Sequence, residues 1–169
     1  MATLAGEAKR VKPLEADGYE KFLAIAAIAL LVTVLVALGR GYAHWGAVPA
    51  MVWAHLATIL PALALTPVML LRRRGDRPHR LLGRIWVAAM LLTALVSFGV
   101  RLSNHGGLSF IHLISAYVLV AAPLLWWSAR SHQVARHRTA VRGMVTGALL
   151  IAGFFTFPFG RMLGSWLFG

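Results

Sequence analysis

The sequence contains no cysteine, which excludes disulfide bonds, thiolate metal sites and cysteine nucleophiles but says nothing about the compartment. Charged residues are also scarce: they make up 13% of the 169 residues, whereas a soluble domain carries about 25%. Hydrophobic residues account for 59%. This composition is typical of a protein that lies in lipid, and the length corresponds to one domain.

Acidic residues are few, only five in all, and none of them falls in a long apolar run. The sequence also has no HExxH or GxSxG motif, so a hydrolytic enzyme is disfavoured. The middle of each apolar run carries no Asp, Glu, Lys or Arg. This argues against an ion or proton transporter, because transporters place such residues at mid-depth.

Five long apolar runs alternate with charged clusters. A transmembrane helix needs about 20 apolar residues, and about 17 at the least, so the third run reaches this length only if its helix begins earlier, near Pro78 to Leu81. The first run is longer than the core of a signal peptide and no clear cleavage site follows it, so we interpret it as an uncleaved anchor. We therefore predict an all-α membrane protein with about five transmembrane helices. The runs are residues 22–39, 47–71, 85–100, 108–128 and 143–160.

Lys and Arg fall mainly on one side of the predicted membrane. Fourteen of the 17 lie in the N-terminal segment (residues 1–21), in the loop after the second run and in the loop after the fourth, and only Arg40, Arg101 and Arg161 lie on the other side. The positive-inside rule then places the N-terminus in the cytoplasm and the C-terminus outside, in a bacterial inner (plasma) membrane. The net charge of +12 has this topological explanation and does not call for nucleic acid. A basic cytoplasmic face favours contact with anionic membrane lipid.

The second and third runs resemble the fourth and fifth as two copies of one helical hairpin. Each copy has a His-Leu pair near the start of its first helix, a proline within that helix, and a His-Arg pair in the arginine-rich loop before its second helix. Two tandem hairpins predict a four-helix bundle over residues 47–163, with repeats at 47–102 and 108–163 and the first helix (22–39) packed outside it. The matching residues are His55-Leu56 and His112-Leu113, Pro67 and Pro123, and His79-Arg80 and His137-Arg138.

The repeat places four histidines in two pairs, each pair split between two parallel helices. His55 and His112 fall near the outer face, and His79 and His137 fall near the cytoplasmic starts of their helices. A low-spin haem b takes two axial neutral imidazoles and needs no CxxCH motif, so each pair is a candidate set of axial ligands, for one haem or two. The haem propionates would bind arginines near each face. These candidates are Arg80, Arg84, Arg138 and Arg142 inside, and Arg101 and Arg161 outside.

Simpler roles remain open for these histidines. An interfacial histidine such as His55 often bonds only to a carbonyl or to water, although ionisable residues inside a membrane are functional candidates. His79 and His137 stand among arginines and would also suit contacts with phospholipid headgroups. Gly83, one helical turn after His79, would let a flat ring approach its helix. His105 lies in an outer loop, where it is a candidate for a substrate site.

The run from His79 to Arg84 has the pattern His-Arg-x-x-Gly-Arg, and with its flanks (residues 45–160) it resembles an uncharacterised family of small bacterial membrane proteins, known only as a domain of unknown function. That label implies no activity. The layout is also similar to cytochrome b561-type proteins, which have a four-helix core with a histidine on each helix, hold two haems, one toward each membrane face, and pass electrons across the bilayer. The resemblance implies that the haem ligands are His55, His79, His112 and His137.

Two classes of function follow from these observations. The first is transmembrane electron transfer through haem b, with a quinone, a soluble reductant or a partner subunit as the redox partner. The alternative is a structural or assembly subunit of a larger respiratory or photosynthetic membrane complex, because five closely spaced helices leave little mass outside the membrane. A homo-oligomer is compatible with either. A zinc site built on His55 and His112 would lack further ligands.

Overall fold

A computed structural model of the protein describes residues 15–100 and 110–169. Every element in these two ranges is helical, as the sequence predicts. Four helices are long and apolar enough to cross a membrane, which fits a multi-pass membrane protein. Arg101 and His105 lie outside the described residues, as do residues 1–14 of the N-terminal segment. The four helices are α1 (Gly18–Arg40), α2 (Ala50–Leu71), α3 (Arg77–Ser97) and α4 (Phe110–Arg130).

The third helix begins before its apolar run, as predicted. Asp76 caps α3, and its Oδ1 accepts a hydrogen bond of 2.7 Å from the backbone N–H of His79. Pro78 follows in the first turn, where a missing N–H costs no helical hydrogen bond. His79 therefore lies in the first turn of α3, and the helix fixes the direction in which its side chain projects.

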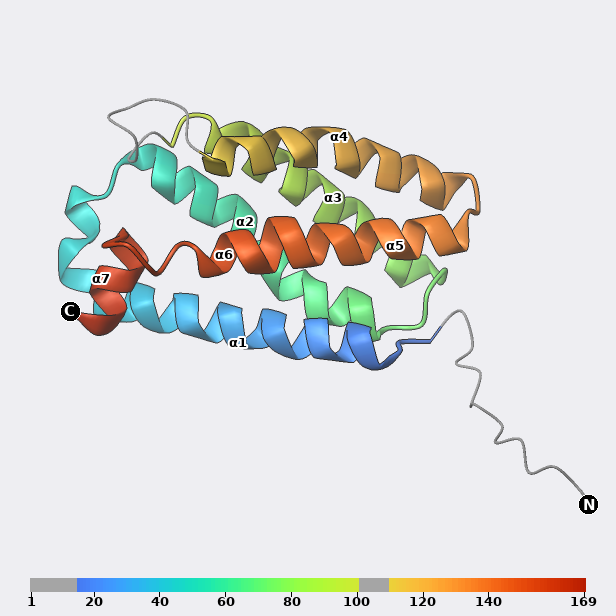
Figure 1. Ribbon diagram of the computed structural model, residues 1–169, viewed down its shortest axis with the longest axis horizontal. Helices are drawn as coiled ribbons and strands as arrows, with labels where there is room; N and C mark the ends of the chain where they lie inside the picture. The colour runs from blue at the N-terminus through green and yellow to red at the C-terminus, as the bar shows by residue number, and fades with distance from the viewer. Residues whose placement is uncertain (1–14, 101–109) are drawn as a thin grey trace, which may run out of the picture.

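The last apolar run forms part of a longer helical rod whose bounds differ from the prediction. The rod consists of α5 (Val134–Met144), the π-helical segment η3 (Val145–Ile151) and α6 (Ala152–Phe154), which follow one another without a break (Figure 1). It ends at Phe154 and not near Gly160, because Pro158 disfavours the helical conformation in the residue before it. Phe159 and Gly160 then adopt left-handed backbone angles, with φ of 65° and 66°.

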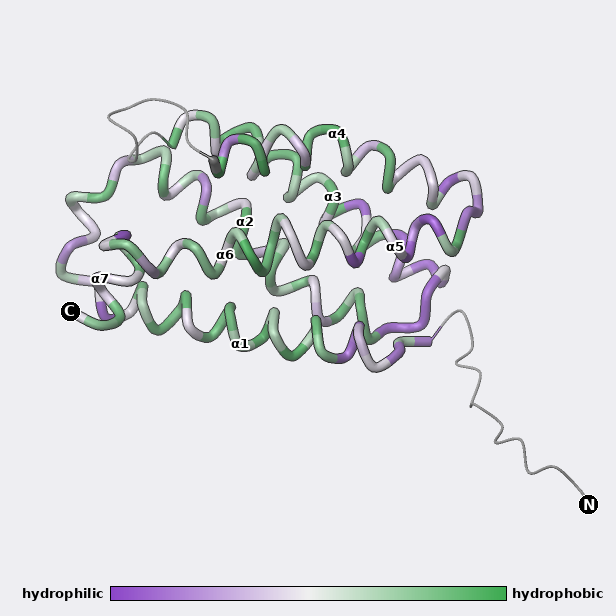
Figure 2. The backbone as a smooth tube through the Cα atoms, in the orientation of Figure 1, coloured by the Kyte–Doolittle hydropathy of each residue, from purple (hydrophilic) through white to green (hydrophobic). Residues whose placement is uncertain are grey.

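The helices lie side by side and alternate in direction, so that the charged turns gather at one end of the bundle (Figure 1). The start of α1, the α2–α3 turn and the α4–α5 turn lie together at what we call the basic end. The end of α1 and the C-terminus lie at the opposite end. Figure 2 shows that the hydrophilic residues are concentrated at the basic end and that the middle of most helices is hydrophobic.

The first helix, α1, contributes side chains to the main hydrophobic core of the bundle. Leu23, Ala24 and Ala27 of α1 are buried in the main hydrophobic core, together with residues of α2, α3, α4 and η3. The two alanines let the helix backbones approach closely, as small residues do in membrane proteins. α1 contacts α2 and η3, and through them it reaches the interior of the bundle.

A short C-terminal helix, α7 (Met162–Phe168), packs against α1 and was not predicted. Two glycines allow this close packing. A Cβ atom on Gly164 would lie 1.7 Å from the carbonyl oxygen of Phe157, and one on Gly41 would lie 2.1 Å from the ring of Trp166.

Replacing Gly164 with alanine should therefore loosen α7. The clash involves backbone and cannot be relieved by a side-chain rotation, so we expect a loss of about 1–3 kcal/mol in the packing of this helix. Hydrogen exchange of the α7 amides would measure it as faster exchange. Gly39→Ala is the matched control, because a Cβ there meets no atom within 4 Å. Equal exchange in the two variants would contradict the prediction.

Candidate functional site

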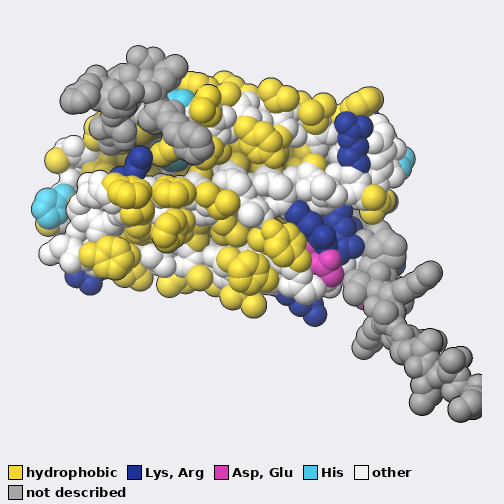
Figure 3. Space-filling model, in the orientation of Figure 1, with side chains coloured by type: hydrophobic (Ala, Val, Ile, Leu, Met, Phe, Trp, Pro, Cys, Tyr) yellow, Lys and Arg dark blue, Asp and Glu magenta, His cyan; other side chains and the backbone are white. Residues whose placement is uncertain are grey.

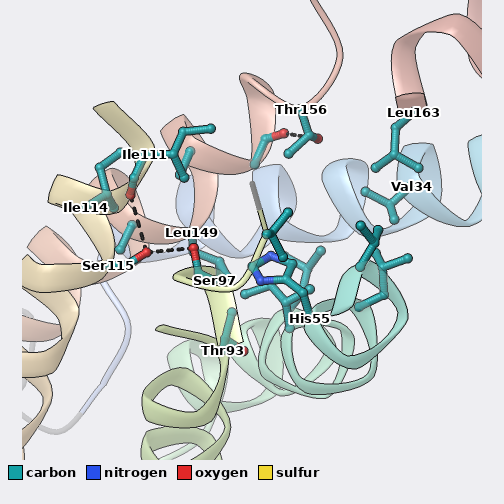
Figure 4. A pocket seen from close by; sticks show the side chains of 18 of the residues that line it. Val34, His55, Thr93, Ser97, Ile111, Ile114, Ser115, Leu149, Thr156 and Leu163 are labelled. Atoms are coloured by element: carbon teal, nitrogen blue, oxygen red, sulfur yellow. Dashed lines mark hydrogen bonds between the residues drawn. The ribbon is translucent and has the colours of Figure 1, made fainter. Parts of the chain in front are cut away.

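A cavity toward the opposite end of the bundle is lined by His55 of α2 and His112 of α4. Its volume is about 630 Å³, within the range of about 300–1,000 Å³ for ligand sites. Most of its wall is aliphatic, and its polar side chains lie on α2, α3 and α4 and in the chain after α6, which contributes Thr156 (Figure 4) and Arg161. We call it the His55 cavity. It brings together the histidine pair that the repeat predicted for the outer face.

Polar atoms of the His55 cavity are buried and incompletely satisfied. The Nδ1 atom of His55 and the Oγ1 atom of Thr93 are buried and have no hydrogen-bond partner among residues 15–100 and 110–169. By contrast, Ser115 Oγ donates to Ser97 Oγ at 2.8 Å. His112 is only 6% exposed, and its ring lies 5.7 Å from that of Phe98. Leaving a buried polar atom unpaired costs free energy, so a ligand that bonded His55 would remove such a cost.

The predicted propionate candidate of this face, Arg161, also lines the His55 cavity. It is half-buried and comes directly before α7, at the rim formed by the chain after α6. Among the described residues that line the cavity, Arg161 is the one with a permanent positive charge. It can therefore hold an acidic group of a ligand that enters between the two histidines.

A second cavity, of about 360 Å³, lies toward the basic end and is lined by His79 of α3 and His137 of α5. We call it the His79 cavity. The Nδ1 atom of His137 lies 3.3 Å from the carbonyl oxygen of Leu125, and a proton on Nδ1 would leave Nε2 as the free base that a metal binds. The Nδ1 atom of His79 is buried without a hydrogen-bond partner in the described part of the chain.

The wall of the His79 cavity has room for a flat group beside α3. Gly83 lines it, and a Cβ added there would meet only the flexible side chain of Met69, at 3.4 Å. Arg80 and Arg84 line the same cavity. The guanidinium carbon of Arg84 lies 6.0 Å from the centre of the Trp126 ring, which holds this charge at the cavity wall through a cation–π contact.

The two cavities are stacked along the bundle and separated by a thin apolar layer. On α2, Leu63 lines the His55 cavity and Thr66 lines the His79 cavity. Three residues of helix rise about 4.5 Å. Trp86 is buried and lines the His79 cavity, where its indole N–H donates to Thr66 Oγ1 at 2.9 Å. A ligand in one cavity is therefore separated from a ligand in the other by about one helical turn.

Sequence reasoning missed a buried carboxylate beside the His79 cavity. Glu20 of α1 is 1% exposed and accepts two hydrogen bonds from the guanidinium of Arg138, at 2.7 and 2.8 Å. Arg74 forms an ion pair with it, and Arg142 donates to it at 3.3 Å. We call this set, with Asp17, the Glu20 network. Figure 3 shows the basic side chains gathered around acidic ones at this end of the molecule.

Asp17 completes the Glu20 network from the residue that caps α1. Its carboxylate accepts from the Glu20 backbone N–H at 3.0 Å, and Glu20 accepts from the Asp17 N–H at 3.1 Å, which forms a capping box. Burial alone would raise the pKa of the Asp17 carboxyl, but the Glu20 N–H and the guanidinium groups of Arg142 and Arg138 outweigh it and lower the pKa. The Asp-x-x-Glu spacing before an apolar run is the signal that predicts the capping box.

Two predicted propionate candidates thus have carboxylate partners within the protein. Arg138 lines the His79 cavity but is paired with Glu20 and Asp17, and Arg142 pairs with the same carboxylates and is not part of the cavity wall. Arg80 and Arg84 form no ion pair with any described carboxylate. Of the four inner candidates, these two are the ones with charge available for a ligand.

The donor set of both cavities suits a group that brings most of its own metal ligands. Within the described ranges, no three His, Cys, Asp or Glu side chains gather as a metal site made of protein alone would need. A haem iron takes two imidazoles as axial ligands. The first cavity is lined by two histidines, and the second is lined by His132 in addition to His79 and His137. Comparison of the chain with protein-family models, with curated proteins and with solved structures finds no match.

Proposed function

We propose that the protein carries electrons across a membrane through b-type haem, with one haem in each cavity. The observation that carries this proposal is the pairing of the histidines. Four histidines selected by a sequence repeat lie as two pairs, and each pair lines one of two stacked cavities. Chance would scatter four such residues over a helical surface, whereas two haems would require this arrangement.

The chain offers the groups that haem needs. His55 and His112 would be the ligands in one cavity, and His79 and His137 in the other. In the His79 cavity the carbonyl of Leu125 would orient the ring of His137 by accepting its Nδ1 proton. When bound, haem supplies one-electron redox chemistry, and the largely aliphatic wall of the His55 cavity would keep water away from a haem there. The propionates would bind Arg161 in the first cavity and Arg84 in the second.

We also propose that the chain crosses the bacterial inner membrane five times, with the basic end in the cytoplasm. The rod from Val134 to Phe154 is as long as α3, which supports a fifth crossing. The Glu20 network and the arginine-rich turns lie at one end, in accord with the positive-inside rule. In this arrangement the two haems would lie at different depths, as in cytochrome b561-type proteins. A quinone, a soluble reductant or a partner subunit would exchange electrons at either face.

The first test is a reduced-minus-oxidised visible spectrum of detergent-purified protein, with haem measured per chain. The proposal predicts sharp b-type bands and about two haems per chain. One haem per chain would limit the proposal to a single cavity. If the protein contained no haem after expression with ample haem supply, the proposal would be wrong. The alternative, a structural or assembly subunit of a larger membrane complex, would then be tested by pull-down.

A further inference from the structure

The basic end carries more positive charge than the protein or haem propionates can balance. Among the described residues that line the His79 cavity, five are arginines and only Glu20 is acidic. Two propionates would still leave two arginines without a counter-charge. Unbalanced charges in a partly buried site repel one another, and an added anion relieves the repulsion. The arginines are Arg74, Arg80, Arg84, Arg130 and Arg138.

Ion pairs identify which of these arginines are free. Arg74 and Arg138 bind Glu20, and the remaining ion pairs of the described residues involve Arg72 and Arg142. Arg84 lies over the ring of Trp126. Arg80 and Arg130 are exposed and form no ion pair with a described carboxylate, although both line the cavity. They project from neighbouring helices, α3 and α4, and a guanidinium binds a phosphate through two parallel hydrogen bonds.

Apolar side chains lie next to these two arginines on the outer surface of the same helices. Leu81 and Ile85 of α3 are 58% and 46% exposed, and Trp127 of α4 is 57% exposed. An inorganic phosphate would use only the arginines. A phospholipid would use both parts, because its phosphate would bind the guanidinium groups while its acyl chains covered the apolar surface.

We propose that Arg80 and Arg130 form a binding site for the headgroup phosphate of an anionic phospholipid from the leaflet at the basic end. The site does not depend on haem. It lies at the mouth of the His79 cavity, outside the histidine pair, and Arg84 remains available for a propionate.

The test compares two double variants that lose the same charge. In Arg80→Gln/Arg130→Gln both headgroup ligands are removed. In the control, Arg73→Gln/Arg136→Gln, two other exposed arginines of the basic end are removed, and neither of them lines the cavity. Native mass spectrometry would count phosphatidylglycerol retained by each protein against phosphatidylcholine. We expect the first variant to bind phosphatidylglycerol about tenfold more weakly than wild type, and the control to bind it as wild type does.

Three results would overturn the proposal. Equal loss in both variants would indicate a general surface-charge effect. Displacement of the lipid by millimolar inorganic phosphate would indicate a free-phosphate site. If lipid binding were unchanged but haem were lost from Arg80→Gln/Arg130→Gln, the anion would be a haem propionate. Haem content measured in parallel keeps the two proposals apart, since selective lipid binding by a protein that contains no haem would refute only the electron-transfer function.

Discussion

Replacing His55 with alanine should remove one haem and leave the other in place. The two histidine pairs line separate cavities at different positions along the bundle. Loss of one axial imidazole would leave the iron of that cavity with one protein ligand, and the alanine would open space where the ring was. We expect about one haem per chain in place of about two. His79→Ala should give the same stoichiometry but retain the other haem, with a different spectrum and midpoint potential.

The measurement is haem per chain by pyridine haemochrome, together with electron paramagnetic resonance of the oxidised protein. Adding haem together with imidazole to His55→Ala should restore the low-spin signal, because the cavity left by the side chain can admit the free ligand. His44→Ala is the control, since His44 is exposed and lines neither cavity. Loss of both haems from each variant, or of neither, would contradict the assignment of one histidine pair to each cavity.

The helices and the grouping of the histidines could be predicted because both depend on local patterns. Apolar length determines where a chain can cross lipid, and the repeat predicted which histidines share a depth. The start of α3 near Pro78 followed from the length argument. The structure places His55 with His112 and His79 with His137, which are the pairs that the repeat suggested.

Other features depend on contacts between distant segments and leave little trace in the sequence. Arg138 binds Glu20 across 118 residues of chain, and neither residue alone indicates that partner. The π-helical segment η3 consists mostly of ordinary apolar residues, and it packs against α1 and α4. The helix α7 depends on the close approach of Gly164 to Phe157. The sequence predicted that Arg138 and Arg142 would bind haem propionates. In the structure both arginines pair with carboxylates of the protein itself.

Replacing Glu20 with glutamine should have the largest effect on stability. Glu20 is 1% exposed and pairs with Arg74 and Arg138, whose side chains are only 10% and 19% exposed. The amide keeps the shape of the side chain but removes its charge, so the largely buried guanidinium of Arg74 would lose its carboxylate and that of Arg138 would keep only Asp17. Breaking a buried ion pair from one side typically costs about 3–5 kcal/mol. Thermal unfolding in detergent should show this loss, while Glu15→Gln, an exposed control two residues before Asp17, should stay within about 0.5 kcal/mol of wild type.

The same variant tests whether the Glu20 network supports the His79 cavity. Arg138 follows His137 directly on α5, and Glu20 fixes Arg138 to α1. When that link is lost, the first turn of α5 should move more freely, and the haem of the His79 cavity should be released more readily than the haem of the His55 cavity. A double-mutant cycle with Arg138→Gln should show a coupling of about 0.5–3 kcal/mol between the two side chains. If Glu20→Gln unfolded at the same temperature as Glu15→Gln, the Glu20 network would not hold α1, the α2–α3 turn and α5 together. The arginines of α5 would then be available to a ligand after all.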